Sequence, residues 1–294
     1  MDKKLKMLLR NSKYKTVDRL RTEVAKLITS YKGYGTKVWD NFEPHGLYRA
    51  RQHNHLEGNL TDVGLQKFTS ELEFWNNPAE NCTLGRCNDV GESIFYCSNE
   101  FEVAIQEIKP WKEYITTSVF CPKPKQNQTS TSHAIPIGIE YLAELPALEK
   151  FFKPIEKENI RFEELDSFLN YLFYNNIIQG NSHLYKLSTA IFKNMMSPIR
   201  NGTMDIPMQG LVYSSMARDK KGFNIAFKPG HVISNYYIYG VQTHKVLENT
   251  DKAITIQLIR NGEVQRIRNS VSESSDISWY EPLVNGEIFT FEKK

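Results

Sequence analysis

The sequence predicts an α+β fold built on a mixed β-sheet, and three observations lead to this prediction. Apolar residues recur at helical spacing near the N-terminus and again between residues 163 and 196. From residue 209 onward the apolar spacing changes to every second residue, which is typical of strands. Strands and helices do not alternate regularly along the chain, as they would in a βαβ fold. We therefore expect helical segments at the N-terminus and in mid-chain beside a separate sheet.

The first 43 residues form a predicted helical N-terminal extension. Residues 1–15 hold six Lys or Arg side chains, which suits either an arm that binds phosphate or a solvated, frayed terminus, and we favour the terminus. Thr16 is a candidate N-cap for the helix that follows, and Gly33 lies beyond its expected end. One face of this helix is apolar and is expected to pack, and it consists of Val17, Leu20, Val24, Leu27 and Ile28.

The middle of the chain combines a predicted loop with two predicted helices. Residues 121–138 contain three prolines and a cluster of Gln, Ser and Thr, a composition typical of a loop. The helices belong to an expected insertion at about residues 140–200, and we interpret their apolar stripes as core contacts. The stripes are Leu165, Phe168, Leu169 and Leu172 in the first helix, and Leu184, Leu187, Ile191 and Met195 in the second.

Alternating residues predict strands in the last third of the chain. Phe223, Ile225 and Phe227 alternate in one stretch, and Ile254, Ile256 and Leu258 alternate in another. The dipeptide Asn261–Gly262 follows the second stretch and is favoured in two-residue turns, so we expect a hairpin there. Residues 241–294 thus form a predicted β-rich C-terminal extension, packed on a core domain of residues 44–240.

Composition and charge argue against several classes of protein. The chain has 294 residues, of which 40% are apolar and 24% charged, as in ordinary globular proteins. Its 37 basic and 34 acidic side chains give a net charge of +3, which does not indicate nucleic-acid binding. No apolar stretch reaches the ~18 residues of a membrane span, and the N-terminus lacks the apolar core of a signal peptide. We therefore expect a cytoplasmic protein.

The cysteines do not predict a metal site. The four cysteines, Cys82, Cys87, Cys97 and Cys121, show no Cys-x-x-Cys spacing, and no closely spaced pair of histidines accompanies them. We expect them to be reduced, as in a cytoplasmic protein. Phosphate loops of the Gly-x-Gly-x-x-Gly or Walker type are also missing from the sequence. We therefore expect neither a metal ion nor a bound prosthetic group.

Two arginines stand two residues apart in the stretch GLYRAR at residues 46–51. If this stretch is a strand, Tyr48 points to one face, while Arg49 and Arg51 share the opposite face. Two guanidinium groups side by side can donate parallel hydrogen bonds to a phosphate or a carboxylate. Such a pair is more often a surface salt-bridge donor, so both interpretations stay open.

The run GRCNDVGESIFYCS at residues 85–98 groups several polar residues around one short strand. Gly85 and Gly91 permit backbone turns that other residues adopt at a cost. A helix is expected directly afterwards, at residues 100–109, with Ser98 or Asn99 as its cap. Glu107 falls on the border of the apolar stripe of this helix, from which a carboxylate can lean into a cleft or face the solvent.

Several segments in a fixed order resemble the RES-domain family, which is named for its Arg, Glu and Ser. They are YRAR at 48–51, NP at 77–78, GRCN at 85–88, GESIFYCS at 91–98, AIQEIKPW at 104–111, and the region from GLVYSS to GFNIAFKP at 210–229. The resemblance covers residues 44–230, about two-thirds of the chain. Members of this family degrade NAD⁺, and many are toxins paired with an antitoxin. The resemblance also implies a fold related to that of ADP-ribosylating toxins.

The resemblance assigns three catalytic residues, position by position. The family's Arg falls on Arg49, its Glu on Glu107 and its Ser on Ser215. The family's Tyr-Pro-Ser reads Tyr213-Ser214-Ser215 in this chain, so Ser215 is assigned by spacing and Ser214 stays an alternative. The match leaves residues 1–43 and 240–294 unexplained, and it is loose over 121–200.

The resemblance also assigns residues that bind NAD⁺. The Gly-Arg-x-Asn element falls on Gly85, Arg86 and Asn88, and the strand tyrosine falls on Tyr96. By this assignment Arg49 and Arg86 hold the pyrophosphate, and Tyr96 stacks on the nicotinamide or its ribose. The predicted binding residues further include Arg51, Ser93 and Tyr213.

The resemblance implies a single catalytic carboxylate. When the N-glycosidic bond of NAD⁺ breaks, nicotinamide leaves as a neutral molecule, so the leaving group needs no general acid. The transition state resembles an oxocarbenium ion, as in glycoside hydrolysis. Glu107 is expected to stabilise the developing positive charge and to accept a hydrogen bond from a ribose hydroxyl.

Three functions from different classes remain open at this point. The first, which we favour, is an NAD⁺ glycohydrolase or phosphorylase that transfers ADP-ribose to water or to inorganic phosphate. The second is an ADP-ribosyltransferase that modifies a macromolecule, and the third is a non-catalytic nucleotide-binding or nucleic-acid-binding module. The expected partners are NAD⁺, phosphate and an antitoxin protein, and we expect neither a membrane nor a nucleic acid.

Overall fold

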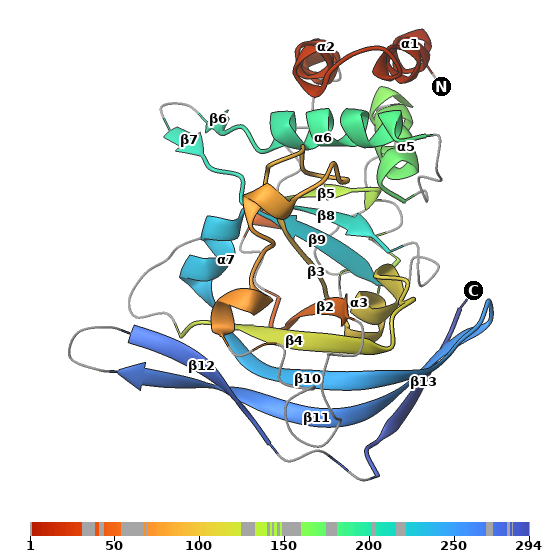
Figure 1. Cartoon of the computed structure of the whole chain (residues 1–294). Helices are drawn as coiled ribbons and strands as arrows, with labels where there is room; N and C mark the ends of the chain where they lie inside the picture. Colours follow the sequence, from red (N-terminus) through yellow and green to blue (C-terminus); the bar gives the residue numbers. More distant parts are fainter. Residues whose placement is uncertain are drawn as a thin grey trace.

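Helices from the N-terminus and from the middle of the chain lie above a long, curved sheet in this protein (Figure 1). A computed structural model describes residues 2–30, 39–40, 44–53, 68, 70–124, 133–139, 142, 144–145, 148, 160–174, 181–201, 204–215, 222–268, 273–280, 283 and 285–293. The helices are α1 (Lys3–Ser12), α2 (Val17–Ser30), α3 (Phe101–Glu107), α5 (Ile160–Tyr174), α6 (His183–Met195) and α7 (Pro229–Asn235). Two short 3₁₀ helices span Glu71–Phe74 and Ala79–Asn81. Within the described chain, no helix is both long and apolar enough to cross a membrane.

The described strands form one mixed sheet of eleven strands and a separate two-stranded ribbon, β6–β7. The first strands are β1 (Trp39–Asp40), β2 (Leu47–His53), β3 (Phe95–Ser98), β4 (Tyr114–Pro122), β5 (His133–Ile137), β6 (Ile199–Asn201) and β7 (Met204–Ile206). The others are β8 (Gly210–Ser214), β9 (Phe223–Phe227), β10 (Tyr236–Asn249), β11 (Ala253–Arg268), β12 (Glu273–Trp279) and β13 (Ile288–Glu292). The sheet order is β1-β5-β8-β9-β3-β2-β4-β10-β11-β12, and β13 pairs with β11.

The predicted α+β class is correct, because helices and a mixed sheet occur without regular alternation. β5 pairs with β8 in parallel, whereas β9 pairs with β3, and β4 with β10, in antiparallel fashion. The sheet runs without a break across the boundary expected at residue 240, which lies inside β10. Strands β10 to β13 therefore extend the same sheet on which the rest of the chain is built (Figure 1).

The N-terminal segment is more ordered than the sequence led us to expect. We favoured a frayed terminus for residues 1–15, and this was wrong, because α1 forms there and the Asp2 carboxylate caps it by accepting from Lys4 N at 2.8 Å. Leu5 and Leu8 are buried on one face of α1, while its basic side chains lie on the other. α1 contacts α2 and α6, so its apolar face holds the basic stretch against the protein.

The predicted packing helices are confirmed. α2 begins at Val17, directly after the expected cap Thr16, and the apolar stripes of α2, α5 and α6 are buried in one cluster against β5 and β8. Gly33, which lies beyond the expected end of the first of these helices, is outside the described residues. The loop predicted at 121–138 is shorter than expected, because β4 continues to Pro122 and β5 begins at His133.

The hairpin predicted at Asn261–Gly262 is wrong. β11 runs straight through this dipeptide, and Gly262 pairs with Val241 of β10 on one side and with Trp279 of β12 on the other. A Cβ atom at this glycine would lie 2.8 Å from Val241 Cγ2 and 2.9 Å from Trp279 Cε3. The glycine therefore serves close packing between neighbouring strands rather than a turn.

Candidate active site

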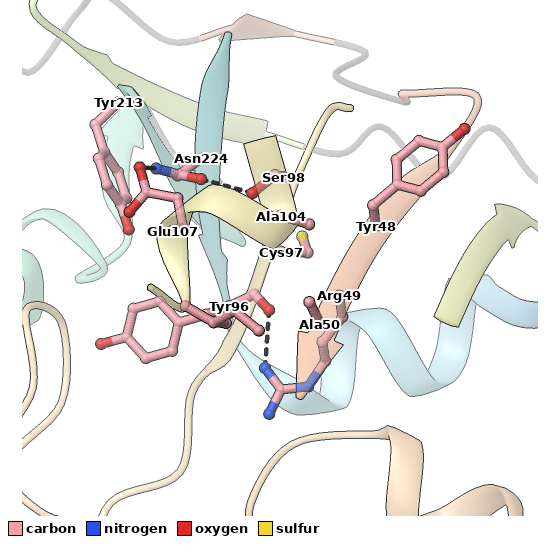
Figure 2. A pocket seen from close by; sticks show the side chains of 11 residues that line it. Tyr48, Arg49, Ala50, Tyr96, Cys97, Ser98, Ala104, Glu107, Tyr213 and Asn224 are labelled. Atoms are coloured by element: carbon pink, nitrogen blue, oxygen red, sulfur yellow. Dashed lines mark hydrogen bonds between the residues drawn. The ribbon is translucent and has the colours of Figure 1, made fainter. Parts of the chain in front are cut away.

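A cavity of about 210 Å³ opens where β2, β3, α3, β8 and β9 meet (Figure 2). β3 lies between β2 and β9 in the sheet, and α3 follows β3 directly, so side chains from distant parts of the sequence meet here. Four of the predicted site residues line the cavity, namely Arg49, Tyr96, Glu107 and Tyr213. The remaining lining includes two polar side chains that were not predicted as site residues, Ser98 and Asn224.

Glu107 is the last residue of α3, and its side chain reaches the cavity from the border of the helix. Its Oε1 atom accepts two hydrogen bonds, from Ser215 Oγ at 2.6 Å and from Asn224 Nδ2 at 2.7 Å. Within the described chain no group donates to Oε2. The helix ends here because Lys109, two residues further on, has a φ of 45°, a left-handed conformation that often terminates helices. The carboxylate is thus held through Oε1, and Oε2 is left for a ligand in the cavity.

Ser215 is the serine that reaches the carboxylate. It follows β8, and its backbone N–H donates to Gly222 O at 2.8 Å, which holds the hydroxyl beside Glu107. The alternative residue, Ser214, is also buried, but its hydroxyl has no hydrogen-bond partner among the described residues. Of the two serines, Ser215 is thus the one whose hydroxyl donates to Glu107. Two other carboxylates close to Glu107 in the sequence, those of Glu100 and Glu113, are absent from the cavity lining.

Arg49 approaches the cavity from β2. Its Nη1 donates to Tyr96 O at 2.8 Å, and its guanidinium lies over the ring of Phe95 at 5.5 Å from the centroid (Figure 2). Its Nε is buried and has no hydrogen-bond partner among the described residues. Burial, and to a smaller extent the nearby charge of Arg51, lower the pKa of Arg49 to about 10. The group therefore remains a cation at neutral pH, with a donor available for an anionic ligand.

The loop before β3 is fastened by the hydroxyl of Tyr96. This hydroxyl accepts from Cys87 N at 2.7 Å and donates to Asn88 Oδ1 at 2.9 Å. Asn88 Nδ2 in turn donates to Thr83 O at 2.7 Å. A Cβ atom at Gly85 would lie 2.3 Å from Asn88 Oδ1, so only glycine fits there. Asn88 therefore shapes the loop and presents no polar atom to the cavity lining.

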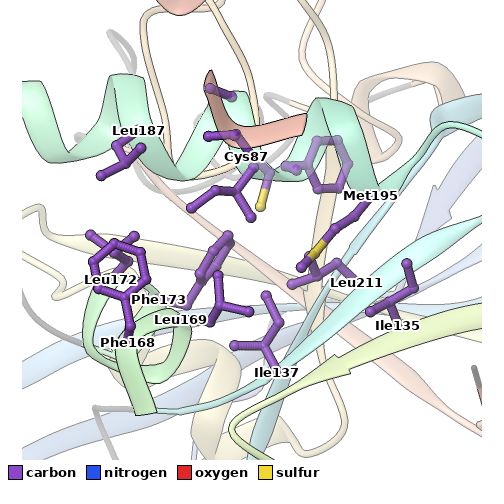
Figure 3. Packing of buried hydrophobic residues seen from close by; sticks show 14 of the residues in the cluster. Cys87, Ile135, Ile137, Phe168, Leu169, Leu172, Phe173, Leu187, Met195 and Leu211 are labelled. Carbon is purple, nitrogen blue, oxygen red and sulfur yellow. The ribbon is translucent and has the colours of Figure 1, made fainter. Parts of the chain in front are cut away.

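The same loop is anchored to the helical layer. Cys87 is buried in the apolar cluster between α6 and the sheet, close to Leu187 and Met195 of α6 (Figure 3). Lys193 of α6 forms ion pairs with Glu92 at 2.5 Å and with Asp89 at 3.6 Å. The wall of the cavity that Tyr96 provides is thus held in place by α6.

Arg86 lies behind the cavity and not in its lining. Its Nη1 donates to Phe173 O of α5, and its guanidinium lies over the ring of Tyr213 at 5.6 Å from the centroid. Burial lowers the pKa of Arg86, but the ionisable groups of Tyr213 and Glu107 outweigh this effect, and the pKa lies above its usual value. Arg86 is thus a cation that supports Tyr213 and adds positive potential near Glu107.

Arg51 and Ser93 also bond within the protein, beside the cavity. Arg51 Nη2 donates to Asn77 Oδ1 at 2.6 Å and to Trp75 O at 3.3 Å. Ser93 Oγ accepts from Asn76 Nδ2 at 2.6 Å and donates to Asn77 O. Neither residue belongs to the cavity lining. Together they join the segment around residues 75–78 to β2 and to the loop before β3.

Ser98 and Asn99 serve the sheet and not the helix. We expected one of them to cap α3, and this was wrong, because Glu100 occupies the N-cap position without a side-chain cap bond. Ser98 Oγ donates to Asn224 Oδ1 at 2.6 Å, and Asn99 Oδ1 accepts from Phe223 N at 2.8 Å. Both side chains therefore join β3 and its continuation to β9.

Reasoning from the sequence missed Asn224 as a site residue. The segment GFNIAFKP was noted for its alternating apolar residues, yet all five residues of β9 are buried. An asparagine in a fully buried strand is unusual, because a buried amide needs hydrogen-bond partners. An asparagine within an otherwise apolar strand was therefore the signal in the sequence that could have identified Asn224 as a site residue.

The cavity can bind an anionic ligand at Arg49 and stabilise positive charge at Glu107. Among the described residues no group of three or more His, Cys, Asp and Glu side chains could hold a metal ion, and all four cysteines are unpaired. Searches of protein-family models and of curated proteins return no match to this chain. The function must therefore be argued from the site itself.

Proposed function

We propose that the protein cleaves the N-glycosidic bond between nicotinamide and ribose in NAD⁺ and transfers ADP-ribose to water or inorganic phosphate. The observation that supports this most strongly is the state of Glu107. Its carboxylate is fixed through Oε1 by Ser215 and Asn224, and Oε2 is left for a ligand in a cavity that Arg49 also lines. The order of the RES-like segments points to the same activity.

Glu107 provides the negative charge that the reaction needs. Because nicotinamide departs as a neutral molecule, positive charge develops on the ribose and no proton donor is required. A fixed carboxylate stabilises such an oxocarbenium-like transition state more than it stabilises the ground state. Glu107 also stands at the C-terminal end of α3, where the unpaired carbonyl groups of a helix carry negative partial charge. Both contributions lower the energy of the cation.

Arg49 provides the binding of the anionic part of the substrate. Its guanidinium lines the cavity, and its described hydrogen bond uses Nη1 alone, so a phosphate oxygen can bond to another donor of the group without displacing that contact. The cavity of about 210 Å³ is smaller than the ~300–1,000 Å³ of sites that enclose a drug-sized ligand. We therefore assign it to the nicotinamide riboside end of NAD⁺, with the pyrophosphate at Arg49.

The aromatic rings of the cavity suit the flat nicotinamide group. Tyr96 of β3 and Tyr213 of β8 contribute two rings, one from each strand that flanks β9, and both line the cavity together with Glu107 (Figure 2). Burial raises the pKa of both tyrosines well above the usual value, so their hydroxyls stay neutral. Neutral rings stack on a cationic pyridinium favourably, because the face of an aromatic ring is electron-rich.

The test of the proposal is to follow where the ADP-ribose goes. Purified protein is incubated with NAD⁺ labelled in its adenine ring, with and without inorganic phosphate and with bacterial protein or RNA. Label recovered as ADP-ribose or as ADP-ribose phosphate supports the proposal and identifies water or phosphate as acceptor. Label attached to protein or RNA would instead establish a macromolecular ADP-ribosyltransferase. Unchanged NAD⁺ in all incubations would contradict the proposal.

A further inference from the structure

Three side chains form a continuous row of hydrogen bonds along the cavity wall. Ser98 Oγ donates to Asn224 Oδ1 at 2.6 Å, and Asn224 Nδ2 donates to Glu107 Oε1 at 2.7 Å (Figure 2). Ser98 and Asn224 face one another across β3 and β9, because they are partners in the antiparallel register. Directly opposed residues of this kind project from the same face of a sheet. The pairing of two strands thus builds this row.

The chemistry of the row permits one orientation of the amide. An ionised carboxylate only accepts hydrogen bonds, so the NH₂ end of Asn224 must face Glu107. The carbonyl end then faces Ser98, whose hydroxyl donates to it. The exposed fractions of Ser98 and Asn224 are 3% and 4%, so water has little access to either group. A rotated amide would set two acceptors against each other in a buried place.

We infer that Asn224 is a positioning residue for Glu107, and that Ser98 fixes the orientation of its amide. The inference rests on the proposed function, since it deepens the role given to Glu107. Asn224 and Ser215 both bond Oε1, and together they determine that Oε2 is the atom presented to the ribose. A neutral amide suits this task, because it holds the carboxylate without cancelling the negative charge that stabilises the cation.

A test based on pH must take account of the other ionisable groups around Glu107, which are the same in wild type and variant. The ionisable side chains that interact with it are Arg86 from the loop before β3, Lys109 just beyond α3 and Tyr213 of β8. Asn224 is the donor among its neighbours that an isosteric substitution converts into an acid. Asn224→Asp therefore changes charge at 2.7 Å from the carboxylate while keeping the shape of the side chain.

The first experiment compares the pH dependence of kcat for nicotinamide release by wild type and Asn224→Asp. Two carboxylates in contact share a proton, because a like charge disfavours the second ionisation. We expect the acid limb of the profile to move to higher pH by about 1 unit or more, and kcat at pH 7 to fall about 10-fold or more, with KM little changed. Asn170→Asp, a buried asparagine of α5, is the matched control and should leave the profile in place.

The serine provides a second, independent pair of variants. Ser98→Ala removes the hydroxyl that orients the amide, so kcat should fall several-fold, and Ser98→Thr should restore most of it. Ser188→Ala removes a buried hydroxyl in α6 that donates to Tyr185 O at 3.2 Å, and it controls for loss of stability alone. Equal kcat and equal pH profiles for wild type, Asn224→Asp and Ser98→Ala would overturn the inference.

A spectroscopic measurement separates this inference from the proposed function. The side-chain carboxyl carbon of Glu107, labelled with ¹³C, is followed by NMR while the pH is varied. We expect its titration midpoint to lie at higher pH in Asn224→Asp than in wild type. An unchanged midpoint would overturn the inference whether or not NAD⁺ is cleaved. If the wild type releases no nicotinamide, but the midpoint lies at higher pH in Asn224→Asp as expected, the proposed function is refuted. The contact between Asn224 and Glu107 is then still established.

Discussion

Replacing Glu107 with glutamine removes the charge that the proposed reaction needs and leaves most of the local structure in place. In Glu107→Gln the amide oxygen can occupy the position of Oε1 and accept from Ser215 Oγ and Asn224 Nδ2, which now lie at 2.6 Å and 2.7 Å. The NH₂ group then occupies the position of Oε2. A ligand in the cavity thus faces a hydrogen-bond donor in the variant, where the wild type offers a negatively charged acceptor.

The magnitude of the effect follows from these contacts. Hydrogen bonds to a charged group contribute about 1.5–3 kcal/mol and neutral ones about 0.5–1.5 kcal/mol, so each of the two bonds at Oε1 weakens by about 1 kcal/mol. Removal of a half-buried charge offsets part of this loss. We therefore expect the melting temperature to change by no more than about 2–4 °C. Turnover should fall about 10²- to 10³-fold, as when one group that stabilises a transition state is removed.

The assay measures nicotinamide release from NAD⁺ by Glu107→Gln and by Glu102→Gln, beside the melting temperature of each variant. Glu102 lies on the same helix and accepts from Gln106 Nε2 at 3.3 Å, away from the cavity lining, so this control should keep wild-type turnover. A well-folded Glu107→Gln with wild-type turnover would refute the catalytic role. Equal loss of turnover in both variants would show that α3 matters only as a scaffold.

Three further predictions test other parts of the account. Arg49→Ala should raise KM for NAD⁺ about 10- to 150-fold through the loss of a charged hydrogen bond. Arg86→Ala should lower the melting temperature and raise KM less than Arg49→Ala does. A larger rise of KM in Arg86→Ala than in Arg49→Ala would mean that Arg86 binds the pyrophosphate. Gly262→Ala places a Cβ atom within 3 Å of Val241 and Trp279 and should destabilise the protein by about 1–3 kcal/mol in chemical denaturation; an unchanged free energy of unfolding would show that β12 can shift. Expression in bacteria should deplete cellular NAD⁺ and slow growth, and an unchanged NAD⁺ level with soluble protein present would count against the proposed function.

Local patterns in the sequence were sufficient for α2, α3, α5 and α6 and for several strands, but not for α1 and α7. α5 and α6 could be predicted because each carries an apolar stripe that only a helix places on one face. The dipeptide Asn261–Gly262 led to a wrong prediction of a hairpin, because here a local pattern disagrees with the pairing of distant strands. Its local preference for a turn is outweighed by pairing of the 16-residue strand β11 with β10 and β12 on either side, which no local pattern reports.

The candidate site could be predicted only in part, because it is built from non-local contacts. Arg49 and Glu107 were found by resemblance, and the fold brings both to one cavity. Arg86 was expected there too, but its donor is taken by Phe173 O, a carbonyl 87 residues away in sequence. Asn224 escaped notice because its role depends on the pairing of β9 with β3, 126 residues from Ser98. Spacing along the chain contains no information about which strands become neighbours.

The most direct test of the central claim is the amount of nicotinamide that the wild-type protein releases from NAD⁺. Purified protein is mixed with a large molar excess of NAD⁺ at neutral pH, and free nicotinamide is measured by chromatography over time. Our account predicts release that rises linearly and exceeds one mole per mole of protein, with an equal loss of NAD⁺. Folded protein that leaves the NAD⁺ intact, with and without phosphate, would contradict it.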